Sequence, residues 1–198
     1  MIFDKSIFLV KERVAFMKLT DTYDILDAES GAVMGIAREI RPTWAKLLRL
    51  LVSKTLLPTV VEVREGDGEN GQLLLVLRKG FGILTHKVSL EDQAGLVLNR
   101  LASKLFSLGG GFKVNSPDGQ QVADMKGDWK GWNFTLSEFH GQEIGKVTKK
   151  WAGLGKELFT SADNYVVEAS PGFTSNKEKK MLLLASALAL DIIFKERK

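Results

Sequence analysis

The feature that most constrains the fold is an apolar run near the C-terminus, Met181 to Phe194, which contains one charged residue, Asp191. Its apolar residues occupy every side of a helix instead of one stripe, so the helix must be surrounded by other structure. Fourteen residues rise about 21 Å, whereas a bilayer core of about 30 Å needs about 20 apolar residues. We therefore expect a buried core helix and not a membrane span.

Most of the chain before this run has the pattern of β-hairpins. Four times an apolar residue lies five positions before a glycine, with polar residues between them and apolar residues after the glycine. Short polar side chains favour tight turns by bonding their own backbone, and glycine accepts the positive φ that such turns need. We expect a hairpin at each pair. The pairs are Leu26 with Gly31, Leu90 with Gly95, Val114 with Gly119, and Leu136 with Gly141.

A further hairpin is predicted between residues 59–64 and 72–78, which flank a polar, Gly-rich loop. Residues 94–108 fit either a strand leading into a loop or a helix, and the hairpin repeat favours the strand. Ser175 and Glu178 match a capping box before the C-terminal helix. Many short strands indicate a barrel or a sandwich, and a barrel around the helix would bury all its faces.

Residues 41–53 depart from the hairpin pattern. Apolar residues recur there at helical spacing, Pro42 suits a first helical turn, and basic residues lie elsewhere around the axis. Amphipathic helices with a Trp–Leu face and cationic flanks partition to anionic interfaces. The alternative is a helix whose apolar face packs over the open end of the barrel. The candidate lipid-binding residues are Arg41, Trp44, Lys46, Arg49 and Lys54.

A second candidate group combines tryptophans with lysines. An aromatic ring beside cations suits a membrane interface or an acidic headgroup. The alternative is that the tryptophans cap the barrel core and the lysines coat it. The candidate residues are Lys126, Trp129, Lys130, Lys149 and Lys150, with Trp132 and Trp151 close in sequence.

Composition limits the class of protein. The chain has 198 residues, 44% of them hydrophobic, which suits one core, so we expect a single domain over residues 1–198. It has no cysteine, which excludes disulfides, thiolate catalysis and Cys-based zinc sites. The first residues lack the pattern of a secretory signal, so we expect a cytoplasmic protein. The formal net charge of +4 allows an anionic partner without requiring one.

Residues suited to catalysis are few. The histidines, His86 and His140, have no acid or nucleophile partner at a family spacing. Residues 153–157 fail as a phosphate loop because an acidic residue follows the lysine, where Ser or Thr would bind magnesium. We therefore expect neither an enzyme nor a bound cofactor.

Three segments near the C-terminus carry a family resemblance. Gly145-Lys-Val-Thr-Lys-Lys-Trp151 comes first, Glu157-Leu-Phe-Thr-Ser-Ala-Asp-Asn-Tyr165 follows, and the apolar helix is last. Together with the short hairpins that precede them, these segments resemble the phospholipid scramblase and LURP-one-related proteins of the tubby C-terminal-like superfamily. The resemblance is most specific over residues 112–194 and looser over residues 7–80. It implies a mainly β fold, an antiparallel barrel of about 12 strands threaded by the C-terminal helix.

The same resemblance implies a calcium-binding loop, but this chain differs from the family pattern at one position of that loop. Scramblase-like proteins typically have Asp at the position of Ser161, and Asp163 and Glu168 remain as calcium candidates. Hard cations need several oxygen ligands, usually more than one of them charged. We therefore expect a weak site or none.

We expect a non-catalytic, monomeric module that binds anionic phospholipid at a membrane surface, which would make it a peripheral membrane protein. Lipid is the ligand class that the resemblance implies. One alternative is phospholipid scramblase activity, and another is a protein-interaction adaptor without lipid contact. Nucleic acid is not an expected partner, because the basic residues are interspersed along the sequence with Asp and Glu.

The predicted basic helix can be tested by reversing its charge. Changing Arg41, Lys46 and Arg49 together to Glu should abolish retention on vesicles of acidic lipid at low salt, because the attraction is electrostatic. The melting temperature should hardly change, since solvent-facing charges contribute little to stability. A variant that binds like the parent would place the lipid surface elsewhere, and a variant that fails to fold would favour packing over the barrel.

Overall fold

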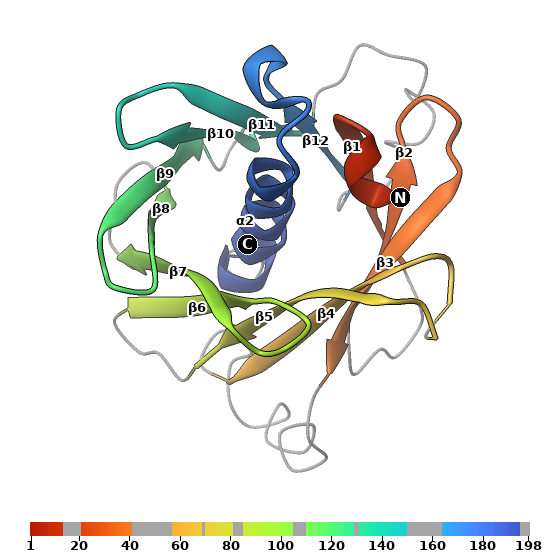
Figure 1. Ribbon diagram of the computed structural model, residues 1–198, viewed down its shortest axis with the longest axis horizontal. Helices are drawn as coiled ribbons and strands as arrows, with labels where there is room; N and C mark the ends of the chain where they lie inside the picture. The colour runs from red at the N-terminus through yellow and green to blue at the C-terminus, as the bar shows by residue number, and fades with distance from the viewer. Residues whose placement is uncertain are drawn as a thin grey trace.

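The computed structural model shows a closed barrel of twelve antiparallel strands, with helix α2 running through its centre (Figure 1). It describes residues 1–13, 21–40, 57–68, 70–80, 85–104, 110–128, 131–149 and 164–194. Consecutive strands pair around the barrel, and β1 pairs with β12 to close it. The predicted fold class, a mainly β barrel around a buried C-terminal helix, is confirmed.

The elements follow the chain in a simple order. The strands are β1 (Ile7–Glu12), β2 (Thr22–Asp27), β3 (Val33–Ile40), β4 (Thr59–Glu65), β5 (Leu73–Lys79), β6 (Thr85–Glu91), β7 (Val97–Lys104), β8 (Gly111–Asn115), β9 (Gln121–Asp128), β10 (Asn133–Glu138), β11 (Glu143–Thr148) and β12 (Tyr165–Ala169). Two short 3₁₀ turns, η1 (Ile2–Asp4) and η4 (Pro171–Phe173), and helix α2 (Lys177–Phe194) complete the described elements.

The glycines of the four predicted hairpins all adopt positive φ. In the β8–β9 hairpin, Gly119 donates its N–H to the Ser116 carbonyl at 3.0 Å, which closes a tight turn. A register shift lies beside the turn in each of the four hairpins, because a left-handed glycine adds one residue to a strand. These hairpins, the β4–β5 hairpin and the strand predicted within residues 94–108 are confirmed.

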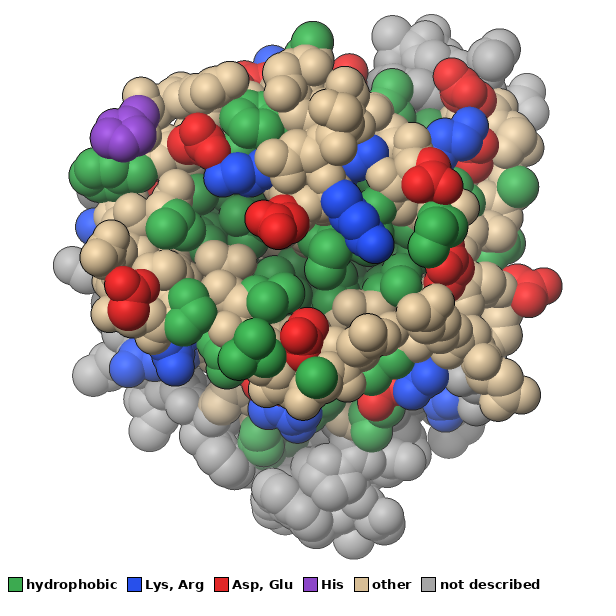
Figure 2. All heavy atoms as spheres, in the orientation of Figure 1, with side chains coloured by type: hydrophobic (Ala, Val, Ile, Leu, Met, Phe, Trp, Pro, Cys, Tyr) green, Lys and Arg blue, Asp and Glu red, His purple; other side chains and the backbone are tan. Residues whose placement is uncertain are grey.

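Helix α2 is enclosed on all sides, as its all-round apolarity predicts. From Leu183 to Leu190, no residue has more than 1% of its surface exposed. Viewed along the barrel, apolar side chains fill the centre and charged side chains lie around it (Figure 2). The side-chain oxygen of Asn176 accepts the Lys179 N–H at 3.0 Å. The predicted cap at Ser175 is therefore wrong by one residue, because Asn caps a helix as well as Ser does.

The two ends of the barrel differ. We name the first the hairpin end: it carries the hairpin loops β2–β3, β4–β5, β6–β7, β8–β9 and β10–β11, and the start of α2. We name the second the connection end, where α2 also finishes. Strand direction alternates in an antiparallel barrel, so every second connection falls at the same end. The strand ends at the connection end lead into residues 14–20, 41–56, 81–84, 105–109, 129–130 and 150–163.

A glycine in β11 lets the sheet approach the helix. A Cβ atom on Gly145 would overlap the carbonyl oxygen of Glu168 in β12 and the side chain of Leu183 in α2. Glycine inside a strand often marks such a close approach of two segments. The contact therefore fixes α2 against the part of the barrel formed by β11 and β12.

Substituting this glycine should loosen the barrel around its helix. Gly145→Ala is expected to lower the free energy of unfolding by about 1–3 kcal/mol, because the strand must shift to admit the methyl group. Gly68→Ala is the matched control: nothing lies within 4 Å of a Cβ placed there. Its effect should stay within about 0.5 kcal/mol. Equal urea midpoints for the two variants would contradict the close approach.

One carboxylate lies in the buried part of α2. Asp191 is 5% exposed and accepts a hydrogen bond from the hydroxyl of Tyr23 in β2. Tyr165 of β12 is also buried. Burial, and after it the charge of Asp191, raises the pKa of both phenols well above their ordinary value of 10.0. The chain has two tyrosines, so every phenol of the protein is in this environment.

This environment predicts an alkaline limit to stability. A phenol whose pKa is raised by folding stabilises the fold fully below its unfolded pKa of 10.0. The stabilisation is lost as the pH rises from 10.0 toward the folded pKa, because only the unfolded chain releases the proton there. Phenolate absorbance should therefore rise together with loss of circular dichroism. Urea-unfolded protein is the control and should titrate near pH 10. Ionisation of either tyrosine in the folded barrel near pH 10 would contradict the prediction.

Candidate functional site

A hollow of about 850 Å³ lies on the outside of the barrel. We name it the outer-wall groove. Its described lining comes from β4 to β8 and from the strand ends beside them at the connection end. Apolar side chains stand next to basic ones. The lining residues that matter here are Ile40, Pro58, Val60, Arg78, Lys87 and Arg100.

Strand alternation turns three basic residues of the groove outward. Leu77, Val88 and Leu101 are buried in the core at 1% exposure or less, so their neighbours in each strand point to the outside. Those neighbours include three of the four basic residues of the lining, Arg78, Lys87 and Arg100. The fourth, Lys79, is buried at 2% exposure. Register then sets their spacing across the wall: Ser89 pairs with Arg78 on one side and with Arg100 on the other. The two arginines therefore lie on either side of one serine.

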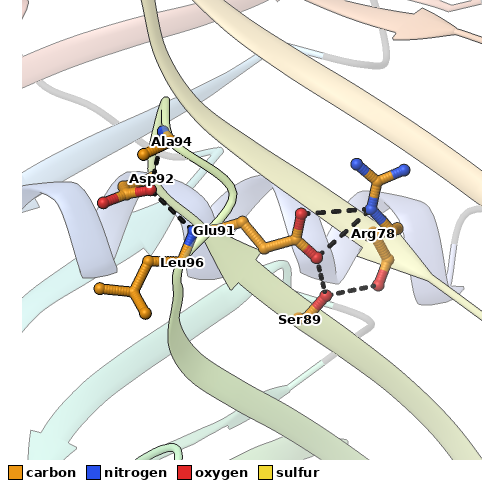
Figure 3. A network of polar contacts seen from close by, with 6 residues as sticks. All are labelled: Arg78, Ser89, Glu91, Asp92, Ala94 and Leu96. Carbon is orange, nitrogen blue, oxygen red and sulfur yellow. Dashed lines mark hydrogen bonds and ion pairs between the residues drawn. The ribbon is translucent and has the colours of Figure 1, made fainter.

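A polar network holds Arg78 in place (Figure 3). Its Nε atom lies 3.3 and 3.2 Å from the two carboxylate oxygens of Glu91, and Ser89 donates to the same carboxylate at 2.8 Å. The terminal nitrogens of Arg78 make no hydrogen bond to a described residue and point away from Glu91 (Figure 3). They remain available to an anion in the groove.

The turn after β6 begins at Asp92, directly after Glu91. The carboxylate of Asp92 accepts the N–H groups of Ala94 and Leu96, each at 2.9 Å (Figure 3). These bonds fix the turn that orients the end of β6. They place Glu91 where it contacts Arg78, so a tight turn contributes to the geometry of the groove.

The other two outward-facing basic residues of the groove, Lys87 and Arg100, have no acidic partner within the described part of the chain. Arg100 donates to the carbonyl oxygen of Pro117, which is neutral. Lys87 is exposed and forms no ion pair with a described residue. Three outward-facing cations and one nearby carboxylate, that of Glu91, give the groove an excess of positive charge. Its chemistry is that of an anion site with apolar neighbours.

A second hollow, of about 560 Å³, adjoins the outer-wall groove. The two share Lys87 and Ala102. Ala102 pairs with Lys113, which adds a further lysine to the lining. Lys126 also lines this hollow, but its ammonium group lies 2.5 Å from the carboxylate of Asp124. The positive character of the groove therefore continues around the wall as far as Lys113 in β8.

The structure places the two predicted site groups differently. The first group lies outside the described residues; its members are Arg41, Trp44, Lys46, Arg49 and Lys54. The described residues on either side of that segment include Ile40 and Pro58, and both line the outer-wall groove. The predicted basic segment is thus joined to the strands at the edge of this groove.

Of the second predicted group, two lysines are described. Lys126 lines the second hollow, and Lys149 lies 4.7 Å from the ring centre of Trp132. Trp132 is 7% exposed, which agrees with the alternative that tryptophans cap the core and lysines cover them. Outside the described residues lie Trp129, Lys130 and Lys150.

The calcium candidates are not brought together in the described structure. Asp163 lies outside the described residues, and Glu168 is in β12, opposite Ile7 and Lys146. No group of three or more His, Asp or Glu side chains within the described ranges could hold a metal ion. That any calcium site is weak or missing therefore stays a prediction from the sequence.

Sequence reasoning missed Arg78, Lys87, Arg100 and Lys113. Lys113 lies between two apolar residues of β8, a pattern that indicates an outward-facing cation, whereas Arg78 follows an unbroken apolar run in β5 and carries no such signal. Their convergence depends on the register between β5, β6, β7 and β8, and spacing along the chain does not contain that register.

Among the helices that the structure describes, none has the length and apolar character that crossing a membrane requires.

Comparison with known proteins gives one finding. The family model described as Scramblase matches residues 120–197, from the turn before β9 through α2. No curated protein and no solved structure matches the chain significantly. The C-terminal part of the chain is therefore scramblase-like in sequence, and the resemblance to the scramblase family, within the tubby-like superfamily, is confirmed over residues 120–197.

Proposed function

We propose that the protein is a non-catalytic module that binds anionic phospholipid, with the outer-wall groove holding the headgroup. The observation that carries the proposal is the composition of the groove. Arg78, Lys87 and Arg100 meet Ile40 and Val60 in one hollow. A phospholipid headgroup offers the same combination, an anionic phosphate next to an apolar glycerol and acyl region.

The electrostatics of the groove favour an anion over a neutral ligand. The Arg78 terminal nitrogens are open, and an arginine fork matches the oxygens of a phosphate group. Lys87 adds a compact positive charge without a described acidic partner. Each basic residue near an anionic membrane contributes about 1 kcal/mol. Three of them provide a measurable but salt-sensitive affinity.

The family match supports lipid as the ligand class. The model that matches residues 120–197 is that of scramblases, so a scramblase-related or lipid-binding function is indicated. Nucleic acid is a poorer fit, because single strands are bound through aromatic stacking. The described lining of the outer-wall groove holds no aromatic side chain. We place the protein in the cytoplasm, as a monomer associated peripherally with the membrane.

Scramblase activity is the second candidate, and the family match is the observation that favours it. The position of α2 favours binding instead. Its central residues, Leu183 to Leu190, are covered by the barrel, so exposing the helix to lipid would require the barrel to open. A transfer assay with leaflet-specific quenching of labelled lipid distinguishes the two, because a binding module leaves the lipid in its original leaflet.

The outer-wall groove can be tested by charge reversal. Changing Lys87 and Arg100 together to Glu should weaken binding to vesicles of anionic lipid by about 30-fold or more. The reason is that two basic residues contribute about 2 kcal/mol and tenfold corresponds to about 1.4 kcal/mol. Co-sedimentation over a series of lipid concentrations measures the change, and vesicles of neutral lipid give the baseline.

A matched control has the same change in net charge. Lys146→Glu with Lys177→Glu alters two exposed lysines, one in β11 and one in the first turn of α2. This control should bind nearly as the parent does, because neither residue lines the groove. Equal losses in both double variants would show that only net charge matters. If the Lys87/Arg100 variant binds as tightly as the parent, the outer-wall groove is not the lipid-binding site.

A further inference from the structure

We propose that the outer-wall groove selects lipids whose phosphate is a terminal group attached directly to the diacylglycerol, which is the chemistry of phosphatidic acid. This inference rests on the proposed function and deepens it, because it names the headgroup. Two observations carry it: the order in which the strands bring apolar and basic side chains together on the wall, and the charge that remains there.

Strand register places six groove-lining residues in one row across the outside of the barrel. We name it the transverse row. Each member pairs with the next, and neighbouring strands lie about 4.8 Å apart. The row is apolar over β3 and β4 and polar from β5 to β8. Its members, in order from β3 to β8, are Ile40, Val60, Arg78, Ser89, Arg100 and Asn115.

The centre of the transverse row suits the three free oxygens of a terminal phosphate. Ser89 lies between the two arginines, and its small side chain is bonded to Glu91 at 2.8 Å, which leaves room for a ligand between them. The terminal nitrogens of Arg78 point away from Glu91 (Figure 3). Arg100 uses Nη1 for the carbonyl oxygen of Pro117 and has no described partner at Nη2. Donors therefore stand on both sides of the space above Ser89.

The net charge of the groove matches a dianion. Arg78, Lys87 and Arg100 face outward, and the carboxylate of Glu91 offsets one of these three charges, so two remain. Lys79 is not counted, because it is buried and alternation turns it to the inside of the barrel. A phosphate monoester loses its second proton at about pH 6 and carries nearly two negative charges at neutral pH. A phosphodiester group carries one.

The apolar part of the transverse row fixes the distance between phosphate and acyl region. Val60 is the direct neighbour of Arg78, and Ile40, which is 42% exposed, lies beyond Val60. A phosphate attached directly to diacylglycerol likewise has apolar groups next to its oxygens. In an inositol lipid, a sugar ring and a second phosphate separate the terminal phosphate from the acyl chains, and these polar groups would lie over Val60. The row therefore fits phosphatidic acid better than a phosphoinositide.

Vesicle binding at matched surface charge tests the selectivity. Vesicles of phosphatidylcholine receive either phosphatidic acid or phosphatidylglycerol, in amounts that give the same zeta potential at about pH 7.5. In co-sedimentation, the parent should bind the phosphatidic acid vesicles about fivefold more tightly, because each bound lipid brings one more charge and one more free oxygen into the groove. Equal binding to the two vesicles would overturn the inference.

Arg78→Lys separates the arginine fork from its charge. Lysine keeps the charge but does not present two parallel N–H donors, so this variant should lose the preference and keep its binding to phosphatidylglycerol vesicles. Arg64→Lys is the matched control: Arg64 also lies in a strand and contacts Glu62 at 2.7 Å, but it does not line the groove. The control should keep the preference.

A preference that survives Arg78→Lys would contradict the placement of the phosphate beside this arginine. Arg100→Lys repeats the test on the other side of Ser89, so the placement can be checked even if the first variant is poorly folded. The melting temperature of each variant, compared with that of the parent, shows whether folding is intact.

Two further ligands distinguish the sources of a terminal phosphate. Glycerol phosphate offers it without acyl chains, and a monophosphorylated phosphatidylinositol offers it on a sugar ring. Glycerol phosphate should displace the protein from phosphatidic acid vesicles only in large excess, because it lacks the apolar part that Ile40 and Val60 would contact. At matched surface charge, the inositol lipid should bind more weakly than phosphatidic acid. Equal or tighter binding of the inositol lipid would overturn direct attachment of the phosphate to diacylglycerol.

The outcomes separate this inference from the proposed function. If the parent binds phosphatidic acid and phosphatidylglycerol vesicles equally, the groove binds anionic lipid without selecting the phosphate, and only the inference fails. If the parent binds neither kind of vesicle, the proposed function fails and the lipid selectivity fails with it. Binding of glycerol phosphate in that case would identify a soluble phosphate monoester as the ligand.

Discussion

The structure depends on the burial of one helix that is apolar on every side. Such a helix gains stability only if nonpolar side chains surround it completely, and a closed barrel is the sheet architecture that does so. Closure in turn requires that every strand pairs with a neighbour on both sides, and the pairing of β1 with β12 completes the circle. It also demands close fits such as that at Gly145, and a partner for the buried carboxylate of Asp191, which Tyr23 provides.

A barrel filled by its own helix leaves its outside and its ends for binding. The cations on the outward side of β5, β6 and β7 converge because strand register aligns them, and the outer-wall groove results. The ends differ because the hairpin loops and the remaining connections alternate around an antiparallel barrel. The anionic ligand that we propose follows from the wall.

Much of the fold was predictable because its signals are local. A glycine five positions after an apolar residue marks a tight turn wherever the rest of the strand lies, and all four such turns are present. The apolar run also predicted the buried helix without reference to its surroundings. The cap at Asn176 was placed one residue too early, since several neighbouring residues can cap a helix. Arg78, Lys87 and Arg100 were missed because their convergence depends on pairing between strands.

The sequence by itself determined the class of fold, because turn chemistry and hydrophobic periodicity act between residues close along the chain. It also determined an excess of positive charge and, through its C-terminal motifs, the likeness to scramblases that the match over residues 120–197 confirms. Only the tertiary structure decided where that charge is concentrated. Register and barrel closure join residues far apart in sequence, and these long-range pairings place three outward-facing cations in one groove.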